Sequence, residues 1–259
     1  MTAKTITRAG ALELCRQRVR DNVAIFGEQF PFIGDDGGGY VLGDNDHWMT
    51  AFWTGELWLA YAGTQDTFYR QAAEQHLDSF RRRLANNVRI THDLGFLFTL
   101  SARAHYLLTD SQEARELGLV AAARLLERYN PNGGYIQAWG EIGDPKEHGR
   151  FIVDCLMNLP LLYWAGAETG DPRYAAAASA HARTTERYIM RPDGSTCHTF
   201  YVDPQTGEPV GPKTVQGYSD DSLWSRGQAW TIAGFAMAAE WSDEEEFIAA
   251  SRRAADRFL

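Results

Sequence analysis

The sequence is poor in cysteine and has no long apolar run. It contains three cysteines, Cys15, Cys155 and Cys197, which lie far apart among 259 residues. An odd number at this spacing fits neither a disulfide framework nor a paired-cysteine metal site. No stretch approaches the roughly 18 consecutive apolar residues of a transmembrane helix, and residues 1–8 lack the apolar core of a signal peptide. We therefore expect a cytoplasmic protein with no membrane partner.

Basic residues are also scarce relative to acidic ones. There are 25 Lys and Arg against 34 Asp and Glu, giving a formal net charge of −9. This balance argues against a nucleic-acid partner. The seven His show no paired spacing with Glu of the zinc-protease kind, and residues 44–46 lack the downstream glycine and glutamate of a calcium loop. We therefore expect no metal site.

A helical hairpin repeats along the chain. Four junctions, at residues 62–66, 108–110, 168–172 and 241–244, each offer Thr, Ser or Asp to cap the following helix. The predicted helices before the junctions are apolar nearly all round, and span residues 52–61, 94–106, 152–164 and 223–241. Those after the junctions carry a charged stripe, and span residues 68–84, 111–129, 173–190 and 244–259. This alternation predicts an inner layer of buried helices wrapped by an outer layer.

A further helix is expected over residues 6–26, which brings the count to about nine helices. Strand signals are few: residues 135–139, and a hairpin over residues 196–210 that turns at 203–207. The sequence has no linker or low-complexity segment. We predict a single all-α domain over residues 1–259.

Asp154 is the most unusual residue of the chain, because it lies within the apolar run of residues 151–164. Such surroundings make ionisation costly and raise the pKa of a carboxyl group. An acid that stays protonated near neutral pH can donate a proton. Asn158 follows one helical turn later, so we expect it on the same face. The alternative is a buried Asp satisfied by a neighbouring helix end or an Arg.

Polar residues gather where the chain enters each predicted inner helix. If these helices run in one direction, their N-termini meet at one mouth, and the polar segments converge there. Asp93 and Asp154 would then form a carboxylate pair of the glycosidase kind. An ordinary N-cap is the alternative role for Asp93. Trp48, Trp139 and Trp230 flank these segments and are candidate sugar platforms, with core packing as the alternative.

Five segments, taken together, resemble unsaturated glucuronyl hydrolases of glycoside hydrolase family 88. They are HDLGF at 92–96, IQAWG at 136–140, DCLMNLPLL at 154–162, HTFY at 198–201 and WSRGQAW at 224–230. The resemblance spans essentially the whole chain and keeps the order of the motifs. It implies an (α/α)6 toroid of helical hairpins that needs no metal or organic cofactor.

The resemblance also implies a reaction. Enzymes of this family remove a 4,5-unsaturated uronic acid from the non-reducing end of lyase-generated oligosaccharides, by hydrating the C4=C5 double bond. Asp154 matches the general acid/base and Asp93 the second essential acid. The positions that match substrate-binding residues are Trp48, His92, Trp139, His198, Gln216, Arg226 and Trp230. Arg226 is the candidate for the substrate carboxylate, because its planar fork suits bidentate binding.

Two alternatives remain at this point. An unsaturated rhamnogalacturonyl hydrolase shares the fold and chemistry, and a non-catalytic sugar-binding fragment would share the fold alone. Family members continue beyond the charged helix of residues 250–259 in which this chain stops. We therefore expect an incomplete toroid of about nine of the twelve helices, lacking its C-terminal part. Apolar faces are then expected to be exposed on the first helix and on the last hairpin.

Overall fold

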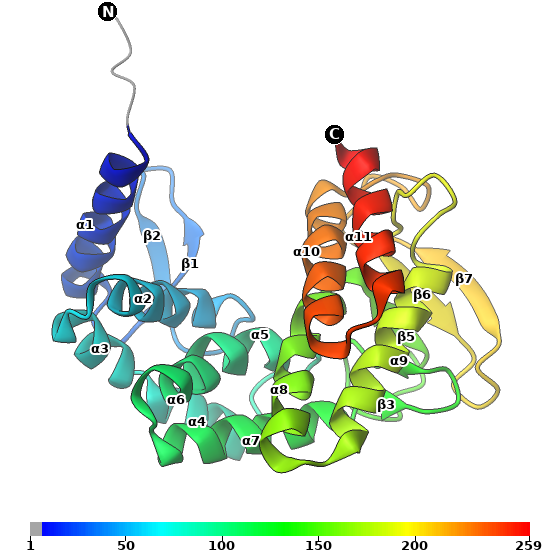
Figure 1. The fold of residues 1–259 in the computed structure, drawn as a ribbon, viewed down its shortest axis with the longest axis horizontal. Helices are drawn as coiled ribbons and strands as arrows, with labels where there is room; N and C mark the ends of the chain where they lie inside the picture. Colours follow the sequence, from blue (N-terminus) through cyan, green and yellow to red (C-terminus); the bar gives the residue numbers. More distant parts are fainter. Residues whose placement is uncertain (1–6) are drawn as a thin grey trace, which may run out of the picture. The chain divides into compact units, whose positions relative to one another are not determined.

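The computed structural model describes residues 7–259, and their contacts fall into two compact units (Figure 1). The first unit contains the chain up to Arg89 together with Leu100–Arg115. The second contains Ile90–Thr99 together with Glu116–Leu259. The single domain expected over residues 1–259 stays a prediction.

The first unit is helical with one small hairpin. Its elements are α1 (Arg8–Phe26), β1 (Phe30–Gly34), β2 (Tyr40–Gly43), α2 (Thr50–Thr64), α3 (Thr67–Glu74), α4 (Leu77–Ala85) and α6 (Ala104–Thr109). Strands β1 and β2 pair antiparallel. Helix α2 packs against α3 as the predicted helical hairpin. The β1–β2 hairpin was not predicted, because its turn at residues 35–39 is rich in glycine and has the composition of an ordinary loop.

The second unit combines helical hairpins with short strands. Its elements are α5 (Leu94–Phe98), most of α7 (Gln112–Leu126), β3 (Tyr129–Asn130), β4 (Tyr135–Ile136), β5 (Arg150–Ile152), η2 (Val153–Asn158), α8 (Leu159–Thr169), α9 (Pro172–Tyr188), β6 (Thr199–Val202), β7 (Pro209–Lys213), α10 (Ser225–Ser242) and α11 (Glu245–Phe258). Helix α8 packs against α9, and α10 against α11 (Figure 1). Strands β5, β6 and β7 form an antiparallel sheet that contains the expected β6–β7 hairpin.

The four predicted junctions share one backbone feature. Each inner helix ends on a residue in the left-handed region, namely Gln65, Asp110, Gly170 and Asp243. At two junctions the expected acid caps the next helix, since Asp66 accepts from the Phe68 amide and Asp171 from the Arg173 amide. The fourth junction differs: Glu244 stands at the N-cap position without a side-chain capping bond. The helical-hairpin repeat is therefore confirmed.

Several predicted helices are not continuous α-helices. The helix expected over residues 68–84 is interrupted between α3 and α4. The one expected over 94–106 passes through a π-helical turn, η1 (Thr99–Arg103). Residues 153–158 form a 3₁₀-helix, so Asn158 does not lie above Asp154 on one face of an α-helix. The strand expected over 135–139 is limited to β4. Apolar periodicity gives the extent of a helix but not its winding.

A buried hydrophobic cluster includes the residues that directly precede Asp154 in the second unit. Phe151 and Ile152 of β5, Val153 of η2, and Phe200 and Val202 of β6 belong to it. Strand β5 leads straight into η2, and Cys155 and Leu156 are completely buried on the other side of Asp154. The sequence thus forces an acid into the core between a buried strand and a buried helix.

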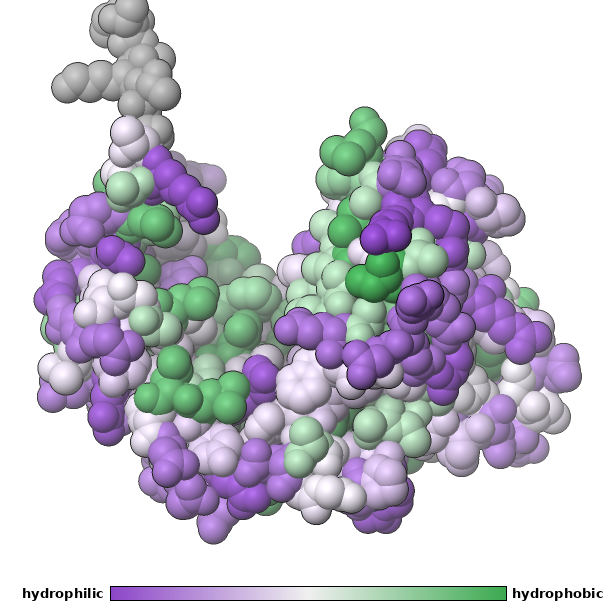
Figure 2. Space-filling view, viewed as in Figure 1, coloured by the Kyte–Doolittle hydropathy of each residue, from purple (hydrophilic) through white to green (hydrophobic). Residues whose placement is uncertain are grey.

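Apolar side chains are exposed on the first helix and on the last hairpin, as expected. On α1, Leu12, Leu14 and Ile25 are at least half exposed, at 50%, 59% and 64%. Trp241 of α10 and Phe258 of α11 are also exposed. Figure 2 shows apolar residues among hydrophilic ones on the surface of each unit. Among the described residues, no helix has the length and apolar character needed to cross a membrane.

Candidate active site

Asp154 is a buried acid with an incompletely satisfied carboxyl group. Its side chain belongs to the first turn of η2, and the residue is 8% exposed. Oδ2 is buried and has no hydrogen-bond partner among the described residues. Burial and, after it, the negative charge of Asp93 raise the pKa of Asp154 to about 7, although Arg226 and Trp230 act in the opposite direction. At neutral pH this carboxyl is therefore balanced between donating and accepting a proton.

Asp93 precedes α5 without capping it. It stands at the N-cap position, but its backbone is in the right-handed helical region and its side chain makes no capping hydrogen bond. The Thr91 hydroxyl instead donates to Asp93 Oδ2 at 2.9 Å, and the Asp93 amide donates to the same hydroxyl oxygen at 3.1 Å. The carboxylate is partly exposed and is left available to other groups.

His92 is buried beside Asp93. Its Nε2 lies 3.5 Å from Asp93 Oδ1, and its Nδ1 is buried without a partner among the described residues. Burial lowers the pKa of His92, against the opposing effect of Asp93. The ring is therefore neutral near pH 7 and offers a polar atom that no described protein group uses. The His92 amide donates to the Ala138 carbonyl at 3.0 Å, which ties this segment to the turn that carries Trp139.

Arg128 binds the backbone of the turn that carries Trp139. The residue is 4% exposed, and its guanidinium donates to the carbonyls of Ile90, Gln137, Ala138, Trp139 and Gly140. Burial lowers its pKa to about 10, so it remains a cation at neutral pH. One buried cation thereby joins the backbone at residue 90 to that of residues 137–140.

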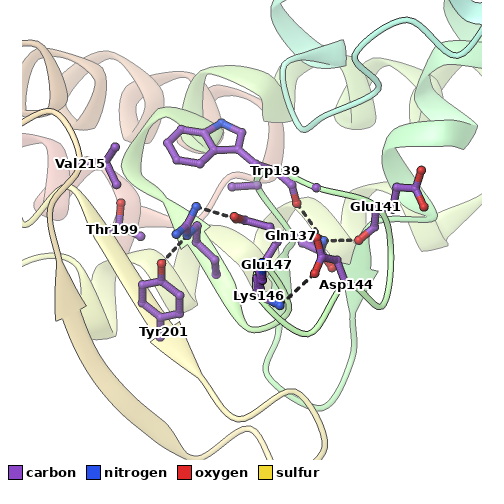
Figure 3. Close-up of polar contacts among 12 residues, drawn as sticks. Gln137, Trp139, Glu141, Asp144, Lys146, Glu147, Thr199, Tyr201 and Val215 are labelled. Atoms are coloured by element: carbon purple, nitrogen blue, oxygen red, sulfur yellow. Dashed lines mark hydrogen bonds and ion pairs between the residues drawn. The ribbon is translucent and has the colours of Figure 1, made fainter.

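Trp139 is half-buried, and Figure 3 shows it with the polar residues around it. The Gln137 side chain donates to the carbonyls of Trp139 and Glu141, both at 2.8 Å. The Arg150 guanidinium lies 5.1 Å from the Trp139 ring centroid. It is held in place by an ion pair with Glu147 and a hydrogen bond to the Tyr201 hydroxyl. The indole ring is thus fixed by its backbone and by a neighbouring cation.

His198 contributes a second neutral imidazole. The Val215 amide donates to Nδ1 at 3.0 Å, so the proton resides on Nε2, which is buried without a partner among the described residues. Burial, followed by the charge of Arg226, lowers the pKa of His198 to about 4. Its ring packs edge to face on Trp224, with centroids 4.9 Å apart, and lies 6.4 Å from the Trp139 ring. The Nε2–H group is a hydrogen-bond donor that no described residue uses.

Arg226 supplies positive charge at the start of α10. It is exposed, and its guanidinium donates to the Gln216 side-chain oxygen. The guanidinium carbon lies 4.2 Å from the centroid of the Trp224 ring. The charge of Arg226 lowers the pKa values of Asp154 and His198. Trp230 lies one turn further along α10, and its ring packs against the Phe96 ring of α5 with the two centroids 5.6 Å apart.

The second unit thus brings together eight of the nine predicted site residues. They are His92, Asp93, Trp139, Asp154, His198, Gln216, Arg226 and Trp230. Trp48 belongs to the first unit, where its ring meets Phe52 edge to face. No group of three or more His, Cys, Asp or Glu side chains able to hold a metal ion occurs between residues 7 and 259. The roles of all nine residues stay predictions.

Sequence reasoning missed Arg128 as part of the site. Arg128 lies within the charged outer helix predicted over residues 111–129, where an arginine is expected to face solvent. Asn158 was noticed only for its spacing from Asp154. Its actual contact, with the Phe96 amide, joins segments that are 62 residues apart, and no local pattern reports such a contact.

The chain is similar to known proteins over most of its length. The family model of Glycosyl Hydrolase Family 88 matches residues 36–247. The chain belongs to glycosyl hydrolase family 88. Among the similar members are an unsaturated glucuronyl hydrolase from Bacillus sp. (strain GL1) and an unsaturated chondroitin disaccharide hydrolase from Streptococcus pyogenes serotype M1. Each is 45% identical over 239 residues, which is 92% of this chain.

Family 88 structures match the fold closely. The crystal structure of the Bacillus sp. GL1 unsaturated glucuronyl hydrolase has a TM-score of 0.94 at 44% identity, and the match covers 96% of this chain and 66% of that one. The unsaturated glucuronyl hydrolase from Streptococcus agalactiae gives 0.90 at 40% identity, covering 95% and 62%. The predicted fold class, an all-α fold of helical hairpins of the α/α-toroid type, is confirmed. This chain spans 63% and 60% of the length of the Bacillus and S. pyogenes relatives.

Proposed function

We propose that the protein removes 4,5-unsaturated uronic acids from the non-reducing end of oligosaccharides by hydrating the C4=C5 double bond. The observation that carries the proposal is the Asp154 carboxyl, buried beside Asp93 with a pKa raised to about 7. Protonating a carbon–carbon double bond needs an acid that still holds its proton near neutral pH. Relatives named for unsaturated glucuronyl and chondroitin disaccharide substrates support this substrate class.

In the proposed reaction, Asp154 delivers its proton to C4. Positive charge then develops at C5, where the ring oxygen shares it. Water adds to C5 and returns a proton to the Asp154 carboxylate, which restores the acid. The resulting hemiketal opens, and the neighbouring sugar leaves. Asp93 keeps Asp154 protonated by like-charge proximity and binds substrate hydroxyls.

The remaining polar groups suit an anionic sugar. Arg226 is the only one of the nine predicted site residues with a permanent positive charge, and it binds the uronate carboxylate in this proposal. His198 Nε2–H, a donor without a partner among the described residues, binds a substrate oxygen. Trp139 and Trp230 supply flat apolar faces for the sugar rings. The Asp93–Asp154 pair argues against a sugar-binding protein without activity, because binding alone gains nothing from a buried acid with a raised pKa.

A hydration test separates this reaction from ordinary glycoside hydrolysis. The protein, expressed from its complete reading frame, is incubated in D₂O with a disaccharide released by a chondroitin lyase. We expect the ultraviolet absorbance of the conjugated double bond to fall as the second sugar is released, with deuterium at C4 of the product. The saturated disaccharide is the control and should not react. Release of sugar without loss of absorbance, or binding without either change, would refute the proposal.

The choice of glycan is tested with a substrate panel. Chondroitin-derived, heparin-derived and pectin-derived unsaturated disaccharides share the first sugar and differ in the second. We expect the chondroitin-derived substrate to react with a higher kcat/KM than the pectin-derived one, in line with the relatives' names. The reverse order would favour an unsaturated rhamnogalacturonyl hydrolase with the same chemistry.

We also propose that the protein works in the cytoplasm. Its three cysteines are all free, with Cys15 exposed and Cys155 and Cys197 buried. Unpaired cysteines are typical of a reducing compartment. Fractionation of the source cells tests this directly, and recovery of the enzyme outside the cytoplasmic fraction would contradict it.

A further inference from the structure

The first amide groups of α5 have an unusual set of partners. The Leu94 amide donates to the Thr91 carbonyl and the Gly95 amide to the His92 carbonyl, both at 3.3 Å. The Phe96 amide does not continue this series. It donates instead to Oδ1 of Asn158, at 2.6 Å, across 62 residues of sequence. An amide in the first turn is one of those that an N-cap side chain normally accepts from.

Asn158 is placed for this contact with little freedom. It is completely buried at the end of η2, and its Nδ2 lies 3.4 Å from the Asp154 carbonyl oxygen. Gly95 packs directly against it: a Cβ added at Gly95 would lie 2.3 Å from Asn158 Cα and Cβ. The two backbones approach so closely only because residue 95 is glycine. One buried amide therefore links the segment of Asp154 to the first turn of α5.

The residue that would ordinarily accept from this turn is Asp93. It stands at the N-cap position and has a suitable side chain, yet it makes no capping bond. Its backbone is helical rather than extended, and its Oδ2 accepts from Thr91. Asn158 thus supplies, from another part of the chain, the acceptor that a capping Asp93 would supply.

We propose that Asn158 is a positioning residue, which caps α5 in place of Asp93 and so keeps the Asp93 carboxylate free for the acid pair. This inference rests on the proposed function of that pair. Asn158 touches neither the reacting atoms nor the substrate in this scheme. It acts through the placement of Asp93 and Asp154. Its Oδ1 accepts from the Phe96 amide in the helix that follows Asp93, and its Nδ2 faces the carbonyl oxygen of Asp154.

Removal of the acceptor predicts a specific rearrangement. In Asn158→Ala the Phe96 amide loses the Asn158 oxygen as an acceptor, and losing a buried hydrogen bond is costly. Asp93 is the nearest carboxylate in sequence, so we expect it to turn back and cap α5. A crystal structure of the variant should show Asp93 accepting from the Gly95 or Phe96 amide. Misplaced acids should lower kcat/KM on the order of 100-fold.

The pH profile distinguishes positioning from a loss of stability alone. The charged groups that act on Asp154 are Asp93, before α5, and Arg226, on α10. Because activity needs protonated Asp154, the rate should fall as the pH rises through its pKa. In Asn158→Ala the Asp93 charge moves away, which lowers the pKa of Asp154. The alkaline limb of the pH–rate profile, where the rate falls, should therefore shift to lower pH. Asn158→Asp keeps the acceptor and adds a negative charge, so the limb should shift to higher pH.

Ser179→Ala is the matched control. It removes a buried hydrogen bond to the Tyr163 hydroxyl in the same unit, between α8 and α9. It should cost stability and leave the alkaline limb unchanged. The proposal is wrong if Asn158→Ala also leaves the limb unchanged, or if Asp93 keeps its wild-type position in the crystal.

Failure of the proposed function would be recognised separately. If the wild-type protein shows no hydration, the Asn158 inference is still testable through stability. The pKa of Asp154 follows from comparing the pH dependence of unfolding with and without Asp154→Asn. It should be lower in the Asn158→Ala background than in the wild type. An equal pKa in the two backgrounds would overturn the inference whatever the activity.

Discussion

Burial and the charge of Asp93 together raise the pKa of Asp154 to about 7, from an ordinary value of 3.8. Raising a carboxyl pKa by this much has a cost, because the ionised form is disfavoured in the folded protein. Such a pair is found where chemistry gains from it. The same shift makes the folded protein sensitive to pH in a predictable direction.

The first prediction concerns stability as a function of pH. Between about pH 4 and 7, folded Asp154 still binds a proton that the unfolded chain has released, so its ionisation destabilises the fold as the pH rises. Asp154→Asn removes this effect. Its free energy of unfolding should match that of the wild type near pH 4 and exceed it by up to about 4 kcal/mol above pH 7. Urea unfolding at both pH values measures the difference, and a constant difference would contradict the raised pKa.

The second prediction concerns the contact between Gly95 and Asn158. Gly95→Ala places a methyl group 2.3 Å from Asn158, against backbone atoms that cannot move easily. The variant should lose about 1–3 kcal/mol of stability, as overpacked sites do. Gly166→Ala in α8 is the control, because its Cβ would meet its nearest neighbour at 3.4 Å. The control should be neutral or gain about 0.5–1 kcal/mol from helix propensity. Equal effects of the two variants in thermal unfolding would show that the close approach is not constrained.

The third prediction concerns Arg128, which donates to five backbone carbonyls. Arg128→Met removes the guanidinium donor from all five oxygens and should cost about 2–5 kcal/mol. Arg128→Lys keeps the charge, but a compact ammonium group cannot reach all five carbonyls. It should therefore retain part of the stability and raise KM, because the Trp139 turn loosens.

Arg183→Lys serves as the control for Arg128→Lys. Arg183 is half exposed and pairs with Glu244 on the surface. Exposed ion pairs contribute little, so this change should alter stability by less than about 1 kcal/mol. If Arg128→Lys behaves in the same way, Arg128 does not hold the turn.

The predictions made from the sequence agree best with the structure where the signal is local. Asp154 could be found because an acid is out of place in an apolar run. The helical hairpins could be found because buried and half-exposed helices differ in composition along their whole length. Both signals are local, and both are retained in the structure. Asp93 was found by its place in the repeat.

Other features depend on contacts that no local pattern contains. The 3₁₀ winding of residues 153–158 accompanies the approach of Asn158 to Gly95, which depends on a segment far away in the chain. The five carbonyls around Arg128 come from turns whose path is set by the fold as a whole. The β1–β2 hairpin contains too many glycines for strand propensity to show. Periodicity therefore predicted the helical scaffold, and the apolar run pointed to Asp154, but neither signal pointed to Asn158 as a cap or to Arg128.

The central claim is that Asp154 is the general acid of a hydration reaction. The most direct measurement is the loss of double-bond absorbance for wild type and Asp154→Asn, with a lyase-generated disaccharide near pH 6. The amide has almost the shape of the acid but no proton to give. We predict a fall in kcat of roughly 10²–10⁴-fold with the fold intact, as is typical for removal of a general acid. An Asp154→Asn protein that is folded and retains wild-type kcat would contradict the account.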